Sequence, residues 1–165
     1  MPIQTIGILG AGTMGHGIAQ VAAWSGYKVN IKDADDERVN KGLAKIEKSW
    51  NRLVEKGKIS SDDVAKAKAN LTACNSMDQL KDCDLIIEAV TENVKIKEQL
   101  LAELGKAVKA ETIIATNTSS ISVTKLAAAS GRAEQFVGMH FFNPVPLMKL
   151  VEIIRGLQTS DTTYQ

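Results

Sequence analysis

The chain has 165 residues, which is enough for one domain with a sizeable hydrophobic core. Lys and Arg number 20 against 19 Asp and Glu, the formal net charge is +1, and aromatic residues make up 4%. This balance, with no basic block, argues against a nucleic-acid partner. No apolar run approaches the ~20 residues of a membrane span, and residues 1–3 leave no room for a signal peptide. We therefore expect no membrane association and a cytoplasmic location.

The first thirty-odd residues show the order of a dinucleotide-binding unit. A short apolar run at 6–9 is followed by a glycine turn, a helical stretch to about residue 25, and a second apolar run at 28–31. Asp33 closes that second run, at the spacing after the glycines that the dinucleotide fingerprint requires. The turn consists of Gly10, Ala11, Gly12, Thr13, Met14 and Gly15.

Each part of this unit has a chemical reason. We expect Gly10 to permit a tight turn, Gly12 to let the backbone approach a diphosphate, and Gly15 to let the helix pack close to the strand. Free N–H groups at the start of the helix would face the phosphates. A carboxylate at Asp33 would accept hydrogen bonds from a ribose 2′-hydroxyl and repel a 2′-phosphate, so the sequence predicts NAD as the cofactor. Lys32 and Arg38 are interpreted as solvated surface charges.

Between about residues 35 and 70 the pattern predicts an inserted helical hairpin. An acidic helix start is followed by an apolar stripe with helical spacing, Gly57 ends the helix, and Ser60 or Ser61 can cap a second helix over 62–69. Two helices exceed what a plain crossover needs. The hairpin therefore serves a partner, a substrate or a second domain, or it is a surface decoration.

The remainder alternates between strands and helices. The predicted strands are 71–73, 84–90, 112–116, 135–139 and 149–154, with a helical turn over 77–81 and helices over 94–108 and 123–129. The polar stretch 156–165 shows no core pattern. This alternation predicts an α/β fold of the Rossmann type, with a doubly wound, mostly parallel sheet whose ligands bind outside the carboxyl ends of the strands.

His140 and Glu152 are the candidate catalytic pair. Oxidation of an alcohol needs a base for the hydroxyl proton, and an imidazole can take and return a proton near neutral pH. A carboxylate on the other ring nitrogen would fix its tautomer. Pro144 and Pro146 force a turn that could bring the two residues together. The alternatives are a structural histidine at a strand end and a glutamate on an edge strand.

Three further polar residues follow strand ends. Ser119 could bind a substrate oxygen or the nicotinamide, or it is a loop hydroxyl. Glu92 and Lys97 could reach a cofactor ribose, although taken alone they are typical of a solvated charge pair. Cys74 and Cys83 match no zinc spacing and are expected to be small buried residues without a disulfide, and we expect no metal site.

Three segments together resemble a known family, the L-3-hydroxyacyl-CoA dehydrogenases, and in particular the bacterial 3-hydroxybutyryl-CoA dehydrogenases. They are residues 10–20 (GAGTMGHGIAQ), residues 117–120 (NTSS) and residues 140–152 (HFFNPVPLMKLVE). The resemblance covers essentially the whole chain. It implies NAD-dependent interconversion of (S)-3-hydroxyacyl-CoA and 3-oxoacyl-CoA in fatty acid β-oxidation or butanoate metabolism.

The resemblance also implies residue roles. His140 would be the base, Glu152 its orienting carboxylate, and Ser119 would lie near the substrate oxygen and nicotinamide. The cofactor positions of the family correspond to Asp33, Glu92, Lys97 and Asn143, and its CoA-contacting positions to Ser49 and Lys56. Lys56 would supply a cation for the CoA phosphates.

The chain departs from the family in length. Family members continue with a helical domain of about a hundred residues that carries the dimer interface and a substrate-binding asparagine, and we expect residues 1–165 to be the NAD-binding domain alone. The full-length protein is expected to form a homodimer.

Two other readings remain: a dinucleotide-binding module without chemistry, and a dehydrogenase of free β-hydroxy acids. Surface meant for the helical domain should be apolar and exposed.

Overall fold

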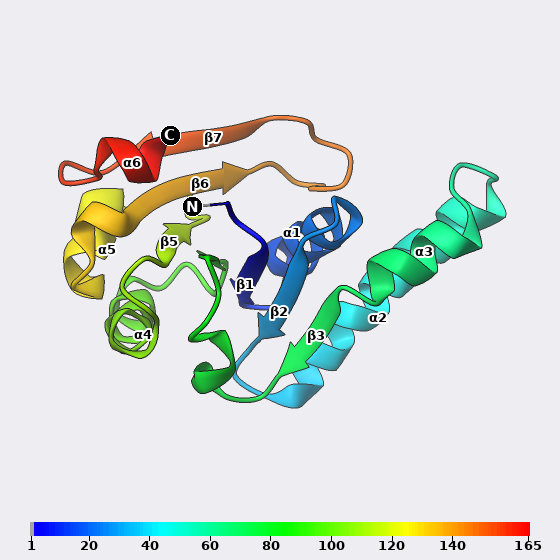
Figure 1. The fold of residues 1–165 in the computed structure, drawn as a ribbon, viewed down its shortest axis with the longest axis horizontal. Helices are drawn as coiled ribbons and strands as arrows, with labels where there is room; N and C mark the ends of the chain where they lie inside the picture. Colours follow the sequence, from blue (N-terminus) through cyan, green and yellow to red (C-terminus); the bar gives the residue numbers. More distant parts are fainter. Residues whose placement is uncertain (1) are drawn as a thin grey trace.

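The computed structural model describes residues 2–165 and contains a seven-stranded sheet (Figure 1). The strand order is β3-β2-β1-β4-β5-β6-β7; strands β1 to β6 pair in parallel, and β7 is antiparallel to β6. The strands are β1 (Thr5–Leu9), β2 (Lys28–Lys32), β3 (Leu71–Cys74), β4 (Leu85–Glu88), β5 (Ile113–Thr116), β6 (Phe136–Phe141) and β7 (Val151–Arg155). The order 3-2-1-4-5-6 is that of the Rossmann fold, so the predicted fold class is confirmed.

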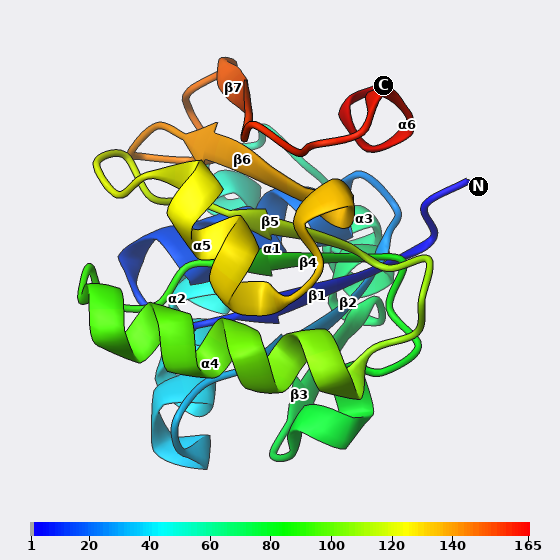
Figure 2. The ribbon, with the colours of Figure 1, turned by 90° about the vertical axis from the view of Figure 1, so that its left-hand side faces the viewer.

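Helices cover both faces of the sheet, with α4 and α5 on one face and α1 and α2 on the other (Figure 2). The predicted helices are present with small shifts at their ends, and two short elements, η2 and α6, were not predicted. The helices are α1 (Thr13–Trp24), α2 (Asp36–Glu55), α3 (Ser61–Lys68), η1 (Met77–Leu80), α4 (Val94–Ala107), α5 (Val123–Ser130), η2 (Ala133–Gln135) and α6 (Asp161–Tyr164), η1 and η2 being 3-10 helices.

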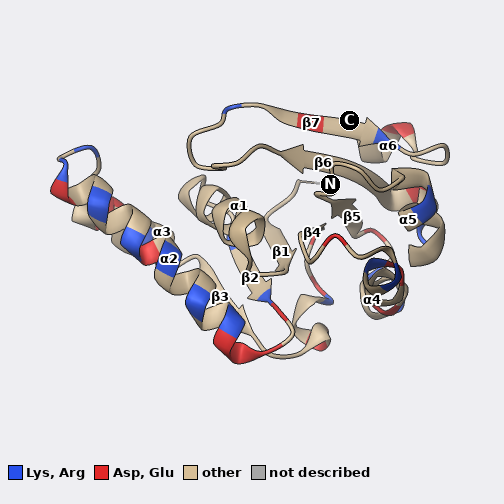
Figure 3. Cartoon of the chain, turned by 180° about the vertical axis from the view of Figure 1, so that it is seen from behind, with Lys and Arg blue, Asp and Glu red and all other residues tan. Residues whose placement is uncertain are grey.

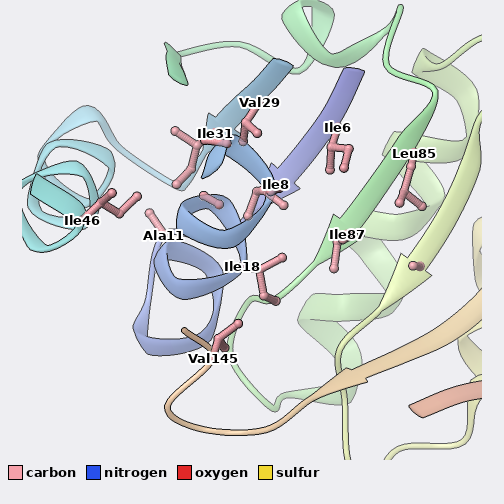
Figure 4. Packing of buried hydrophobic residues seen from close by; sticks show 14 of the residues in the cluster. Ile6, Ile8, Ala11, Ile18, Val29, Ile31, Ile46, Leu85, Ile87 and Val145 are labelled. Carbon is pink, nitrogen blue, oxygen red and sulfur yellow. The ribbon is translucent and has the colours of Figure 1, made fainter. Parts of the chain in front are cut away.

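The sheet separates two hydrophobic cores because successive side chains of a strand point to opposite faces. Ile8 of β1 and Ile31 of β2 pack in one cluster with Ile18 of α1 and Ile46 of α2 (Figure 4). Neighbouring residues on the strands, such as Ile86, belong to a second cluster that includes residues of α4 and α5. Both faces of β4 are therefore buried, as its apolar sequence predicts.

Helices α2 and α3 form the predicted hairpin, which extends away from the sheet (Figure 1). Asp35 and Ser60 cap the two helices by accepting hydrogen bonds from the backbone. Val39, Ile46 and Trp50 form the buried part of the α2 stripe. Basic and acidic residues both occur along the length of the hairpin (Figure 3). The hairpin therefore presents a charged surface beside the sheet edge formed by β3.

The segment between β6 and β7 packs against α1. Val145 is buried and lies against Gly17 of α1, where an added Cβ would approach the Val145 Cβ to 3.0 Å. The Asn143–Pro144 peptide bond is cis. The loop that follows His140 is therefore held against the helix that begins at the glycine turn.

Residues 156–165 show no core pattern and add no residue to the two hydrophobic clusters, but a buried hydroxyl attaches this tail to the sheet. Thr159 is buried; its Oγ1 donates to the Phe136 carbonyl at 2.7 Å and accepts from the Gly156 N–H at 2.8 Å. The tail is therefore fastened to the start of β6 by a hydrogen-bonding side chain. Hydrophobic periodicity cannot reveal such an attachment, because a single buried hydroxyl leaves no apolar pattern.

No helix among residues 2–165 is long and apolar enough to cross a membrane.

Candidate functional site

The glycine turn joins β1 to α1 at the carboxyl edge of the sheet. Gly10 has a φ of +106°, and its N–H donates to the Lys32 carbonyl at 2.7 Å. A Cβ on Gly10 would lie 2.6 Å from the Ala89 carbonyl oxygen, so only glycine fits between β1 and the end of β4. This supports the role predicted for Gly10, and it brings the segment after β4 into direct contact with the turn.

The start of α1 is open to an anionic ligand. Gly12 is the N-cap residue and supplies no side-chain hydrogen bond to the helix. Within the described part of the chain, no heavy atom beyond Gly12 and its two neighbours in sequence lies within 4 Å of the place where a Gly12 Cβ would stand. A Cβ on Gly15, by contrast, would collide with the Gly10 carbonyl. The geometry thus leaves room at Gly12 and free N–H groups in the first turn, as a diphosphate requires.

Asp33 lies immediately after β2 and beside the turn. Its Oδ2 accepts a hydrogen bond from the Ala11 N–H and its Oδ1 accepts one from the Ala34 N–H, both at 2.6 Å. Two cations contact the same residue: Lys32 Nζ donates to the Asp33 carbonyl at 2.9 Å, and Arg38 Nη1 lies 4.0 Å from Oδ1. Lys32 and Arg38 therefore both contact Asp33, the acid that is predicted to bind the cofactor ribose.

His140 and Glu152 face each other on neighbouring strands. They are direct partners in the antiparallel register of β6 and β7, and His140 Nδ1 lies 2.8 Å from Glu152 Oε2. An ionised carboxylate can only accept, so Nδ1–H is the donor and Nε2 is left for another partner. The Phe142 ring lies 4.6 Å from the imidazole, centroid to centroid. The predicted pairing is present, and the strand register brings it about.

The pair opens onto a cavity of about 420 Å³ at the carboxyl edge of the sheet. Ser119, in the loop after β5, lines this cavity together with His140 and Glu152. Asn143 is exposed in the loop after β6 and is outside the cavity lining. The structure thus brings three predicted residues together and places Asn143 at a neighbouring position.

Asn117 is a site residue whose contact the sequence did not reveal. It is buried at the end of β5, and its Oδ1 accepts a hydrogen bond from the Phe141 N–H at 2.9 Å. The contact joins the ends of β5 and β6 and so fixes the strand that carries His140. In the sequence, the indication of a role for Asn117 is its position directly after a predicted strand and two residues before Ser119.

The interpretation of Glu92 and Lys97 as a solvated pair is wrong. The Lys97 side chain is only 1% exposed, and its Nζ lies 2.5 Å from Glu88 Oε1 and 3.6 Å from Glu92 Oε1. Glu88, at the end of β4, was missed because it lies inside the predicted strand 84–90, directly after an apolar run. The signal that could have found it is physical: a buried carboxylate needs a cation or several hydrogen-bond donors.

Ser49 lies on α2, and Lys56 caps the end of that helix seven positions later, which places the two on one side of the helix. The Ser49 hydroxyl accepts a hydrogen bond from Gln20 of α1 at 2.9 Å. Lys56 is exposed near the tip of the hairpin, where α2 ends. The two positions therefore run along the hairpin away from the sheet, apart from the cavity that contains His140.

Three other titratable groups lie outside this cavity. His16, on α1, has Nδ1 2.6 Å from the Gly12 carbonyl, and burial lowers the pKa of its imidazole. Cys74 and Cys83 are buried, unpaired thiols, as predicted; burial raises the pKa of Cys74, and that of Cys83 to about 11. Across residues 2–165, no cluster of three or more His, Cys, Asp or Glu is placed to hold a metal ion.

Comparison with known proteins gives consistent results. Residues 5–165 match the family described as "3-hydroxyacyl-CoA dehydrogenase, NAD binding domain". The chain is 52% identical over 157 residues to a probable 3-hydroxybutyryl-CoA dehydrogenase of Deinococcus radiodurans, covering 95% of this chain and 56% of that protein. It is 46% identical over 160 residues to a fatty acid oxidation complex subunit alpha of Acinetobacter baylyi, covering 97% of this chain and 22% of that protein.

A solved structure agrees with these matches. The crystal structure of the (S)-3-hydroxybutyryl-CoA dehydrogenase PaaH1 from Ralstonia eutropha superposes with a TM-score of 0.96 at 53% identity, covering 99% of this chain and 58% of that one. The chain therefore spans little more than half the length of its dehydrogenase relatives.

Proposed function

This chain belongs to the 3-hydroxyacyl-CoA dehydrogenase family, as the match to its NAD-binding domain shows, and from that premise we propose an activity and a mechanism. The proposed reaction is the NAD-dependent interconversion of (S)-3-hydroxyacyl-CoA, such as 3-hydroxybutyryl-CoA, and 3-oxoacyl-CoA. The observation that carries the proposal is the hydrogen-bonded pair of His140 and Glu152 at a cavity beside Ser119.

The residues that would hold NAD fit its chemistry. The open first turn of α1 suits the diphosphate, and the Asp33 carboxylate suits a free ribose 2′-hydroxyl. Glu92, Lys97, Asn143 and Ser119 complete the proposed cofactor contacts. When bound, NAD supplies the acceptor for the hydride that leaves the alcohol carbon.

His140 is the proposed base. Its Nε2 takes the proton of the 3-hydroxyl group as the C–H electron pair departs as hydride, and the carbonyl forms from the remaining O–H pair. Glu152, bonded to Nδ1, stabilises the resulting imidazolium and fixes the tautomer that leaves Nε2 free. Ser119 is proposed to donate a hydrogen bond to the substrate oxygen. In the reverse direction the imidazolium returns the proton.

The hairpin is the proposed CoA-binding element. Lys56 is exposed at the end of α2, where it can reach a phosphate, and Ser49 lies two turns earlier on the same helix. We propose that the remaining part of the relatives' length corresponds to a helical domain that covers the apolar face near β7, completes substrate binding and forms a homodimer.

The proposed setting is fatty acid β-oxidation or butanoate metabolism in the cytoplasm. Two observations support it. The similar Acinetobacter protein is named a fatty acid oxidation complex subunit, and the two thiols of this chain are unpaired, as is usual in a reducing compartment.

The test has two arms. Calorimetric titration of this chain with NAD⁺ and NADP⁺ should show binding that favours NAD⁺. Turnover should then be measured with acetoacetyl-CoA and NADH, using a chimera of residues 1–165 fused to the remaining part of the Ralstonia relative. Oxidation of NADH by the chimera supports the proposal, with H140A in the same chimera as the control.

The outcomes separate the alternatives. NAD⁺ binding with no turnover of any acyl-CoA would favour a dinucleotide-binding module without chemistry. Turnover of free acetoacetate at a rate equal to that of acetoacetyl-CoA would favour a dehydrogenase of free acids. Absence of NAD⁺ binding would contradict the proposal altogether.

A further inference from the structure

We infer that Glu88 is a positioning residue for the cofactor, acting through Lys97 on the segment that ends in Glu92. The inference rests on the proposed NAD site and assigns a role to a buried carboxylate that the proton-transfer chemistry does not use. Glu88 lies at the carboxyl end of β4, and its residue exposure is 0%.

The Glu88 carboxylate is fully engaged. Its Oε1 accepts from Lys97 Nζ at 2.5 Å and from the Val90 N–H at 2.8 Å, and its Oε2 accepts from Thr116 Oγ1 at 2.7 Å. These partners come from α4, from the segment after β4, and from β5. One buried carboxylate therefore joins three elements at the carboxyl edge of the sheet, where a dinucleotide binds.

Lys97 extends this connection to the surface. Its ammonium also donates to the Val90 carbonyl at 3.3 Å and lies 3.6 Å from Glu92 Oε1. Glu92 is half-exposed, and its other oxygen accepts from Thr118 Oγ1 at 2.7 Å, in the loop that carries Ser119. The cation thus lies between a buried carboxylate and an exposed one.

The same segment forms part of the cofactor cradle. The Ala89 carbonyl and the Val90 nitrogen are the atoms that a Cβ on Gly10 would meet, at 2.6 and 2.9 Å. The backbone at 89–90 therefore packs directly on the glycine turn. Because Glu88 and Lys97 bind Val90 from both its N–H and its carbonyl, they fix the segment that contacts the turn and leads to Glu92.

Glu88 matters because it determines which carboxylate neutralises the buried Lys97 ammonium group. While Glu88 is ionised, Lys97 has a buried counter-ion, and the Glu92 carboxylate remains half-exposed and available to a ligand. If Glu88 is neutralised, Glu92 becomes the nearest counter-ion of a buried ammonium group, and the attraction draws it inward. Cofactor affinity then falls although no residue touching the cofactor has changed.

The experiment measures NAD⁺ affinity and thermal stability of this chain separately. We expect Glu88→Gln, which preserves shape, to weaken NAD⁺ binding roughly tenfold by calorimetry, as the loss of a buried charge partner would. The matched control is Asp84→Asn. Asp84 pairs with Lys109 at the opposite end of the same strand, at 2.7 Å, so its loss should lower Tm and leave the NAD⁺ Kd unchanged.

A second pair of variants, made in a chain that already carries E92Q, tests whether Glu88 positions Glu92 or only stabilises the fold. If Glu88 acts through Lys97 on Glu92, then adding E88Q to E92Q should change the NAD⁺ Kd by less than about twofold. An equal loss of affinity in both backgrounds, or an E88Q chain with the wild-type Kd, overturns the inference. Failure of the wild-type chain to bind NAD⁺ would instead overturn the proposed function.

If E88Q does not fold, E88Q combined with Lys97→Met removes both buried charges and should fold, because loss of a whole buried pair is tolerated better than loss of one member. The NAD⁺ Kd of this double variant should match that of Lys97→Met alone to within about twofold, because Glu88 acts through Lys97. A double variant that binds NAD⁺ more weakly than Lys97→Met also overturns the inference.

Discussion

At the scale of single residues, the site depends on one imidazole whose two nitrogens have different surroundings. Glu152 occupies Nδ1 of His140 at 2.8 Å, so the tautomer that leaves Nε2 without its proton is favoured. The Glu152 side chain is 52% exposed, in contrast to the buried carboxylate of a serine-protease triad. Solvent screens it, and its contribution to orientation is expected to exceed its contribution to charge.

This difference predicts unequal effects of two substitutions in the chimera described above. His140→Ala should lower kcat about 10²–10⁴-fold, since it removes the base. Glu152→Gln should lower kcat by less, because the amide oxygen can still accept from Nδ1–H. Steady-state kinetics of acetoacetyl-CoA reduction check both. A His140→Ala variant with near-normal kcat would remove the residue from the proposed role.

The two cysteines give a second prediction at this scale. Cys74 and Cys83 are 2% and 0% exposed, and burial raises the pKa of Cys83 to about 11. Because the thiolate is the reactive form, both should react slowly with a thiol-specific disulfide reagent at pH 8 in the folded chain. Both should react at once in denaturant. Rapid labelling of either thiol in the native state would contradict this burial.

At the scale of elements, β4 has an acid at each end, and the two acids serve different purposes. Glu88 faces the cofactor edge, whereas Asp84 accepts from Lys109 at 2.7 Å and from the Gln4 and Thr5 N–H groups at the other edge. The bond from Lys109 and the backbone bonds lower the pKa of Asp84 to about 2. Asp84 therefore fastens the start of β1 to the start of β4.

A pH prediction follows from this carboxylate. Its pKa is about 3.9 in the unfolded chain and about 2 in the folded one, so ionised Asp84 stabilises the fold above about pH 4. That stabilisation should disappear as the pH falls from about 4 to about 2. Denaturant unfolding across this window should show a steeper loss of stability in wild type than in Asp84→Asn. Identical slopes would show that the ion pair contributes nothing.

The contact between α1 and the loop after β6 gives a second prediction at this scale. In an open helix, Gly→Ala gains about 1 kcal/mol of stability. Gly17→Ala would instead press on Val145, whose Cβ and Cγ2 lie 3.0 and 3.1 Å from the new methyl group. The gain should therefore be smaller in wild type than in a Val145→Gly background, which removes both of these atoms. Unfolding free energies of the four chains test this, and equal gains in both backgrounds would contradict the contact.

At the scale of the whole molecule, the β7 side stands out because its apolar side chains face solvent. Leu147 is 75% exposed and Leu150 57%, in the segment before β7, and Leu157 after it is 89% exposed. β7 is also an edge strand of the sheet. This agrees with the expectation of an apolar surface for a helical domain, and patches of this kind promote association.

We therefore predict that the chain self-associates at high concentration. Light scattering should show an average mass that rises with concentration, and L147S combined with L150S should reduce the rise. The double variant should leave the NAD⁺ Kd unchanged, because both side chains are exposed and outside the glycine turn. A wild-type chain that stays monomeric at high concentration would contradict the prediction.

Much of the fold was predictable from the sequence because the relevant signals are local. The glycine turn with Asp33, the cap at Ser60 and the apolar run of β4 each lie within a few residues, and each was found in its predicted place. The role of Thr159 was missed, since one buried hydroxyl leaves no periodic pattern. The site was predicted less completely, because its residues come from the ends of separate strands.

By itself, the sequence determined the order of strands and helices along the chain and the cofactor class, and it supplied the candidates for proton transfer. Tertiary structure alone decided which of these side chains meet. It placed His140 opposite Glu152 through an antiparallel register, and it gave Lys97 a buried partner in Glu88. The physical reason is that backbone preferences act between near neighbours, whereas pairing across a sheet depends on packing between segments that are distant along the chain.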